Sequence, residues 1–151
     1  MQERADAGQR GSTEGSALVL EQFFPYRLAS LAEDVSEALA VIYRDRFDLS
    51  RQEWRVLAIL AREGGLTAME VARRSALDKM QVSRAVQALE RKGDLARKPD
   101  PSDKRNRRLE LTLQGRRLYA RIAPIALARE AALLSALSAD ERVILTGMLQ
   151  R

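Results

Sequence analysis

The chain has 151 residues, of which 46% are hydrophobic and 31% are charged, a balance typical of a single folded domain. It contains neither cysteine nor histidine, which argues against disulfides, thiolate metal sites and a histidine general base, so we expect no metal, no cofactor and no enzymatic activity. Because it lacks both an apolar run of about 20 residues and a signal-peptide pattern, the sequence predicts a cytoplasmic protein with no membrane partner.

Positive charge is concentrated in about a quarter of the chain. Residues 79–117 hold 12 basic and five acidic side chains, a net charge of +7, although the whole chain carries only +5. All four lysines lie in this window. A compact basic region of this kind is typical of a surface that meets the phosphates of nucleic acid.

In chain order, the sequence predicts a flexible tail over residues 1–19 and then six helices, over 26–47, 51–63, 68–75, 79–92, 113–137 and 139–150. Signals at the helix starts support these bounds, since a hydroxyl followed three residues later by a glutamate forms a capping box. The pattern occurs at Ser50/Glu53, Thr67/Glu70 and Ser138/Glu141, with a looser version at Asp78/Gln81 and a single capping hydroxyl at Thr112. Pro124 is expected to bend the long fifth helix.

Two short strand-like runs, 94–98 and 108–111, follow the fourth helix and enclose a polar tip. The third and fourth helices are joined by a tight connection, so the chain contains a helix-turn-helix followed by a basic hairpin. The last two helices carry apolar residues on more than one face. A helix that is apolar on several sides is buried on several sides, and in a chain this small the extra side indicates a second subunit.

The fourth helix has two different faces. Val82, Val86 and Leu89 share a stripe that should pack against the preceding helices. The other side offers residue types that suit base edges, because arginine pairs with guanine and glutamine with adenine. The residues concerned are Lys79, Met80, Gln81, Ser83, Arg84 and Gln87, with Ala88 and Arg91 on the same side. A solvated helix face would look similar, but its place as second helix of a helix-turn-helix favours DNA reading.

The hairpin tip places Lys104, Arg105, Arg107 and Arg108 within five positions. Like charges at this density repel one another, which makes little sense as a source of stability. They suit contact with DNA phosphates, or insertion of an arginine into a narrow minor groove. Asp103 is expected to pair with one of these arginines and to stiffen the loop.

The order of the elements, together with four motifs, resembles the MarR family of bacterial winged-helix regulators. Residues 103–108 match its D-x-R-x-x-R wing motif, 82–84 its recognition-helix core, 89–93 the end of that helix, and 111–116 the junction between the wing and the next helix. The likeness covers about residues 25–150. Asp94 departs from the family, which usually has an apolar residue there, so the packing of the first wing strand is an open question.

The resemblance implies a mainly α fold with a small β wing. Its expected parts are a flexible tail (1–19), a dimerisation and pocket helix (20–49), a winged helix-turn-helix DNA-binding domain (50–112) and C-terminal dimerisation helices (113–151). It also implies a homodimer on a pseudo-palindromic operator in double-stranded DNA, with the recognition helices in successive major grooves. Arg105 would probe the minor groove, and Arg108 would pair with Asp103 to hold the wing in shape.

Members of this family mostly repress transcription, and many release DNA when a small, often aromatic and anionic, effector binds between the first, second and fifth helices. In this chain the residues of those elements that suit a pocket are Tyr26, Arg27, Tyr43, Arg46 and Trp54. An arginine can hold a carboxylate by a bidentate pair, which suggests a phenolic or aromatic acid, or its thioester. Alternatively, Trp54 is an ordinary core residue and the two arginines form surface salt bridges.

A repressor that responds to a ligand is therefore the expected function. The alternative is a non-specific architectural DNA-binding protein, in which the helix and the hairpin would touch only the DNA backbone. An enzyme is the third interpretation, although carboxylate pairs such as Glu33/Asp34 suit a solvated helix face. The sequence has no phosphate-binding glycine loop, nucleophile elbow or metal cluster.

Overall fold

The computed structural model describes residues 18–101, 103 and 106–151. Residues 1–17 of the expected tail, and the tip residues Lys104 and Arg105, lie outside the described residues. The chain separates into a unit that ends at Asp34 and a unit from Val35 to Arg151. In the first unit a 3-10 helix, η1 (Leu20–Gln22), precedes the first turns of α1 (Phe24–Phe47), and Phe24 is 71% exposed.

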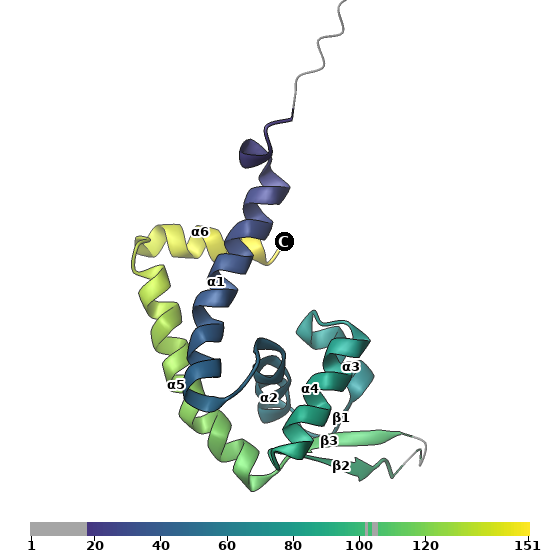
Figure 1. Ribbon diagram of the computed structural model, residues 1–151. Coiled ribbons are helices and arrows are strands. Elements are labelled where there is room, and N and C mark those ends of the chain that lie inside the picture. The colour runs from purple at the N-terminus through teal and green to yellow at the C-terminus, as the bar shows by residue number, and fades with distance from the viewer. Residues whose placement is uncertain (1–17, 102, 104–105) are drawn as a thin grey trace, which may run out of the picture. The chain divides into compact units, whose positions relative to one another are not determined.

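The second unit holds the end of α1 and all the remaining elements (Figure 1). These are α2 (Arg51–Arg62), β1 (Leu66–Thr67), α3 (Ala68–Ser75), α4 (Lys79–Arg91), β2 (Leu95–Pro99), β3 (Arg107–Leu111), α5 (Leu113–Leu134) and α6 (Ala139–Leu149). The strands form one antiparallel sheet in the order β1-β3-β2, and the β2–β3 hairpin pairs Leu95 with Leu111 at its base and Pro99 with Arg107 toward its tip. The predicted mainly α fold with a small β wing is confirmed.

The helix starts follow the local signals in the sequence. Ser50 Oγ accepts a hydrogen bond from the Glu53 N–H at 3.1 Å, while the Glu53 carboxylate accepts one from the Ser50 N–H at 2.7 Å. The same reciprocal box starts α3 at Thr67, α4 at Asp78 and α6 at Ser138. Each box satisfies backbone donors that a helix start otherwise leaves free, so these helices begin where the sequence predicts.

Two features differ from expectation. The sequence does not anticipate β1, which pairs Leu66 with Leu109 of β3 and is too short to leave an alternating pattern. α5 ends at Leu134 rather than near residue 137, and the Ser135 N–H bonds to the Ala132 carbonyl there. No single described helix is long and apolar enough to cross a membrane, and α5 with α6 passes that test only as a pair bent by 111°.

The core of the second unit lies between α2, α3, α4 and the sheet. Leu57 and Leu89 are fully buried, and Leu60 and Leu109 are only 1% exposed. The predicted inner stripe of α4 belongs to this core and is confirmed as buried. Burying one such side chain contributes about 1.5–3 kcal/mol, so the core fixes the rotation of α4 about its axis and turns the opposite face outward.

The base of the wing meets α5 through a close backbone contact. The Asp94 carbonyl accepts a hydrogen bond from the Thr112 N–H at 3.0 Å, and its Oδ1 accepts one from Gln114 Nε2 at 2.9 Å. A Cβ at Gly115 would come within 2.0 Å of the Asp94 carbonyl oxygen, so only glycine fits. Asp94 is therefore buried with its carboxylate paired, and the adjacent Leu95 packs into the core at 2% exposure.

Candidate nucleic-acid interface

The outer face of α4 presents the side chains that the sequence suggests for base reading. Four of them are exposed, namely Lys79, Met80, Arg84 and Gln87. The other two, Gln81 and Ser83, are half-buried. Arg84 and Gln87 lie about one helical turn apart, so their polar ends can address neighbouring base pairs. The predicted residues therefore share one accessible surface.

Gln81 also takes part in the capping box at the start of α4. Its Oε1 accepts a hydrogen bond from the Asp78 N–H at 3.1 Å, as part of the capping box. A bidentate pair with adenine needs both ends of the amide. Gln81 would have to give up its capping bond to make such a pair, whereas Gln87 has no part in the capping box.

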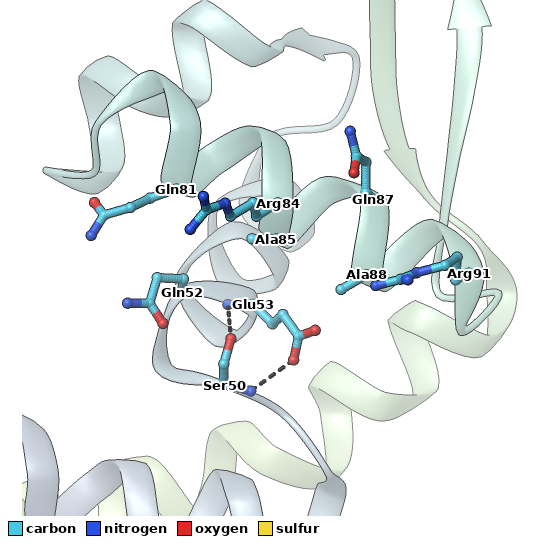
Figure 2. Close-up of a pocket in the computed structure, with 9 residues that line it drawn as sticks. All are labelled: Ser50, Gln52, Glu53, Gln81, Arg84, Ala85, Gln87, Ala88 and Arg91. Atoms are coloured by element: carbon cyan, nitrogen blue, oxygen red, sulfur yellow. Dashed lines mark hydrogen bonds between the residues drawn. The ribbon is translucent and has the colours of Figure 1, made fainter.

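A hollow of about 530 Å³ lies between the outer face of α4 and the first turn of α2. Figure 2 shows its wall on α4, with Gln81, Arg84, Gln87 and Arg91, opposite Ser50, Gln52 and Glu53 of the α2 start. The sequence did not associate these three α2 residues with the site, because only the packing of α2 against α4 brings them there. Local sequence carries no signal for that contact.

The hollow is electropositive on the α4 side. Among the described residues, neither Arg84 nor Arg91 has an ion-pair partner. Glu53, the carboxylate on the α2 side, is 6% exposed and is held by the Ser50 N–H and by Lys92. The hollow therefore offers unpaired guanidinium groups to an incoming anion, and its one acidic residue is already neutralised.

The wing is anchored toward its tip by Arg108, but through a partner that differs from the predicted one. Arg108 Nη2 lies 2.9 Å from Asp100 Oδ2, and Nη1 donates to the Gly65 carbonyl at 2.7 Å. The structure thus gives Arg108 Asp100 as a partner, whereas Asp103, the partner predicted from the sequence, accepts a hydrogen bond from Asn106 Nδ2 at 3.2 Å in the turn. Asp100, which directly follows β2, is only 4% exposed.

The remaining wing charges divide into paired and free. Lys98 pairs with Glu110 across the hairpin, and Arg97 Nε lies 3.0 Å from Glu90 Oε2 of α4. Arg107 is exposed and, within the part of the chain that the structure describes, has no ion-pair partner. Arg107 is thus the wing residue whose charge is available to DNA; Lys104 and Arg105 lie outside the described residues.

Two of the predicted effector residues form part of an aromatic stack. The Trp54 ring lies 4.9 Å from that of Tyr43 and 5.8 Å from that of Tyr119, between centroids, so α1, α2 and α5 meet at these rings. Burial raises the pKa of the Tyr43 hydroxyl above its usual 10.0. Arg46 is exposed on α1, and Tyr26 and Arg27 are exposed in the unit that ends at Asp34.

Comparison with known proteins agrees with this architecture. The MarR family model matches residues 47–106. The HTH-type transcriptional regulator YkoM of Bacillus subtilis (strain 168) is 34% identical over 99 residues, which are 66% of this chain and 64% of the length of YkoM.

Two solved structures share the fold. The transcriptional repressor CouR, bound to a 23-mer DNA duplex, is 28% identical with a TM-score of 0.77 over 89% of this chain and 97% of CouR. PcaV from Streptomyces coelicolor, in complex with its natural ligand, is 26% identical with a TM-score of 0.75 over 90% of this chain and 95% of PcaV.

The fold and the two-faced helix beside a basic hairpin define a winged helix-turn-helix protein. The chain belongs to the MarR family of transcriptional regulators.

Proposed function

We propose that the protein is a homodimeric, sequence-specific DNA-binding regulator that represses transcription in the cytoplasm and is released from its operator by a small effector. The observation that carries the proposal is α4, whose inner stripe is fixed in the core while Arg84 and Gln87 stand exposed on its outer face. CouR, which has the same fold, was solved bound to a DNA duplex. We infer that α4 enters the major groove of DNA, as the second helix of a helix-turn-helix does.

The side chains assigned to base reading are Arg84, toward guanine, and Gln87, toward adenine. Met80 and Ser83 would touch neighbouring bases, Gln81 would do so only by exchanging its capping bond, and Lys79 would meet a phosphate. In the wing, Arg107 would bind a phosphate, as would Lys104. We propose Arg105 as the residue that enters the minor groove, where an arginine gains from the enhanced negative potential.

Apolar residues that one chain leaves uncovered support the proposed homodimer. In α6, Val143 is 72% exposed and Leu149 is 73% exposed, and none of the residues of this helix is buried. Exposed apolar side chains at this density on one short helix mark an interaction surface. A second copy is the partner that a pseudo-palindromic operator requires, because each recognition helix reads one half-site.

The effector is proposed to be an aromatic acid or an aromatic thioester. PcaV was solved with its natural ligand, and this chain has the same fold. The stack of Tyr43, Trp54 and Tyr119 joins α1, α2 and α5, so an aromatic molecule that enters there would compete with the existing ring contacts. Arg46, which is exposed on α1, would supply the positive charge for a carboxylate. Tyr26 and Arg27, which lie in the unit that ends at Asp34, stay predictions from the sequence.

A binding competition separates this proposal from a non-specific architectural DNA-binding protein. The wild-type protein is used to enrich duplexes from a random library, and the enriched duplex is then displaced by itself or by a shuffled version. A specific regulator prefers the enriched duplex by on the order of a thousandfold or more at moderate salt. Equal displacement by both duplexes would contradict a sequence-specific regulator and would support a non-specific architectural DNA-binding protein.

Arg84→Ala tests the residue assignment within that assay. It should weaken binding by about 1–3 kcal/mol and relax the preference at one base position. Arg44→Ala, which removes a positive charge from an exposed pair with Glu37, is the matched control. If Arg84→Ala weakens all sequences equally, Arg84 is a phosphate contact instead.

A further inference from the structure

Lys92 caps the end of α4 and reaches the turn between α1 and α2. Its Nζ lies 3.2 Å from Glu53 Oε2 and 3.4 Å from Asp48 Oδ2, and it also donates to the Asp48 carbonyl. These residues are 39 and 44 positions away in the sequence. The ammonium thus joins the C-terminal end of the candidate reading helix to a distant turn through three contacts.

The turn that Lys92 binds is itself fixed. Asp48 has a φ of 52°, the left-handed conformation that reverses the chain after α1. The backbone N–H groups of Asp48 and Leu49 donate to the carbonyls of Arg44 and Tyr43 at 3.1 and 3.0 Å. Glu53 holds the other side, since its carboxylate caps α2 and its side chain is only 9% exposed.

The electrostatics make this link costly to lose. A buried carboxylate is strongly destabilised when its positive partner is removed, because the charge is left without compensation. The Lys92 side chain is only 32% exposed, so its pair with Glu53 is shielded from solvent more than the Arg44–Glu37 pair of α1 and the Lys98–Glu110 pair of the wing. The C-terminal end of α4 therefore has a charged tether to the α1–α2 turn and the start of α2, in addition to the buried apolar stripe of the helix.

The tether also borders the aromatic stack. Trp54 follows Glu53 directly in α2, and its ring contacts Tyr43 and Tyr119. A change in the packing of these rings would shift the α2 start, and with it the carboxylate that Lys92 binds. The two residues that Lys92 binds are thus close in sequence to the rings: Glu53 directly precedes Trp54, and Asp48 follows Tyr43 by five residues.

We propose that Lys92, with Glu53 and Asp48, is a positioning residue for sequence-selective DNA binding: it sets the placement of α4 relative to the α1–α2 turn. The inference rests on the proposed DNA-binding function. It makes Lys92 act through Glu53 rather than by touching DNA. Loss of the tether would therefore reduce the preference for the correct sequence while binding through the wing charges persists.

The test compares Lys92→Met, Lys92→Arg, Glu53→Gln and the double variant Lys92→Met/Glu53→Gln on the enriched and the shuffled duplex. Glu53→Gln keeps an oxygen for the α2 cap but removes the charge. Each of the variants without the charged pair should lower the ratio of the two affinities by about fivefold or more. The double variant should be no worse than either single one, because both break the same contact. Lys92→Arg should retain most of the ratio.

Controls keep the result interpretable. Arg44→Met removes one positive charge from an exposed pair on α1 and should leave the ratio unchanged. Asp48→Asn removes the exposed partner charge while suiting the left-handed backbone, and should lower the ratio slightly. Thermal unfolding of every variant establishes that binding is measured on folded protein.

Three outcomes would overturn the inference. An unchanged ratio with a lower melting temperature would make the tether purely structural. Equal loss on both duplexes, with a shallower salt dependence for Lys92→Met but not for Glu53→Gln, would make Lys92 a phosphate contact. Additive losses in the double variant would mean that Lys92 and Glu53 act independently and not through their shared contact. If the wild-type protein itself shows no preference, the proposed function fails, which is a different result from a failure of the tether.

Discussion

The segment from α2 to β3 buries its large apolar residues, whereas the helix α6 leaves its apolar residues exposed. Leu57, Leu89 and Leu109 of the first region are at most 1% exposed, whereas Val143 and Leu149 of α6 are more than 70% exposed. Both regions carry the same type of capping box, so helix formation is equally well encoded in each. The difference lies in packing: the lobe from α2 to β3 completes its core within one chain, whereas the apolar residues of α6 stay exposed, and we propose that a second copy covers them.

The largest effect is expected in the lobe. Leu89→Ala removes a fully buried side chain from α4 and should lower the free energy of unfolding by about 2–5 kcal/mol, through lost burial and the cavity that remains. Urea denaturation at two protein concentrations measures this loss, which should be the same at both. A cost below 1 kcal/mol would mean that the core of the lobe is looser than its burial implies.

The counterpart in α6 should act on association instead. Leu149→Glu places a charge where we propose a subunit contact, and a buried leucine contributes about 1.5–3 kcal/mol, so the dimer dissociation constant should rise by roughly tenfold to a hundredfold. Sedimentation equilibrium measures it. Gln150→Glu, which adds the same charge at the neighbouring exposed polar position, is the control. Equal association of Leu149→Glu and Gln150→Glu would contradict the proposed interface.

The capping boxes should not distinguish the two regions. Thr67→Ala and Ser138→Ala each remove a hydroxyl that accepts a backbone N–H, and each should cost about 1 kcal/mol of local helix stability. Amide hydrogen exchange would show faster exchange in α3 for the first variant and in α6 for the second. A cap that matters in only one helix would mean that tertiary packing, rather than local chemistry, defines that helix start.

The smallest effect is a pH dependence. The hydrogen bond from the Thr67 backbone N–H, aided by the Thr67 hydroxyl, holds the pKa of Glu70 below its usual 4.5. The folded state thus binds this proton less readily than the unfolded state, so the stabilisation is complete above pH 4.5 and is lost as the pH falls through the lowered value. Glu70→Gln should flatten this part of the stability profile, measured by urea denaturation between pH 6 and pH 3. An unchanged slope would remove Glu70 from the acid response.

Local chemistry made much of the fold predictable. The starts of α2, α3, α4 and α6 follow from hydroxyl or carboxylate caps within three residues of their partners, and the inner stripe of α4 follows from helical spacing. The end of α5 was missed because the chain has no glycine or other stop signal there. β1 was missed because its two residues gain their structure only by pairing with β3.

The site was predictable on α4 and less so elsewhere. The outward side chains share a face with fixed periodicity, so their exposure follows once the inner stripe is known. The partner of Arg108 depends on how the hairpin folds back, and sequence spacing alone does not choose between Asp100 and Asp103. The contact of Lys92 with Glu53 depends on the packing of α2 against α4, for which no local pattern exists.

Trp54 gives the protein an intrinsic optical reporter. It is the only tryptophan in the chain, and its indole stacks between two tyrosine rings at the point where α1, α2 and α5 meet. Its emission therefore comes from one defined position, next to the residue that binds Lys92. The unlabelled protein can be titrated with a DNA duplex or with an aromatic acid while the tryptophan fluorescence is recorded. A change in emission with both would show that DNA binding and effector binding each alter the surroundings of Trp54.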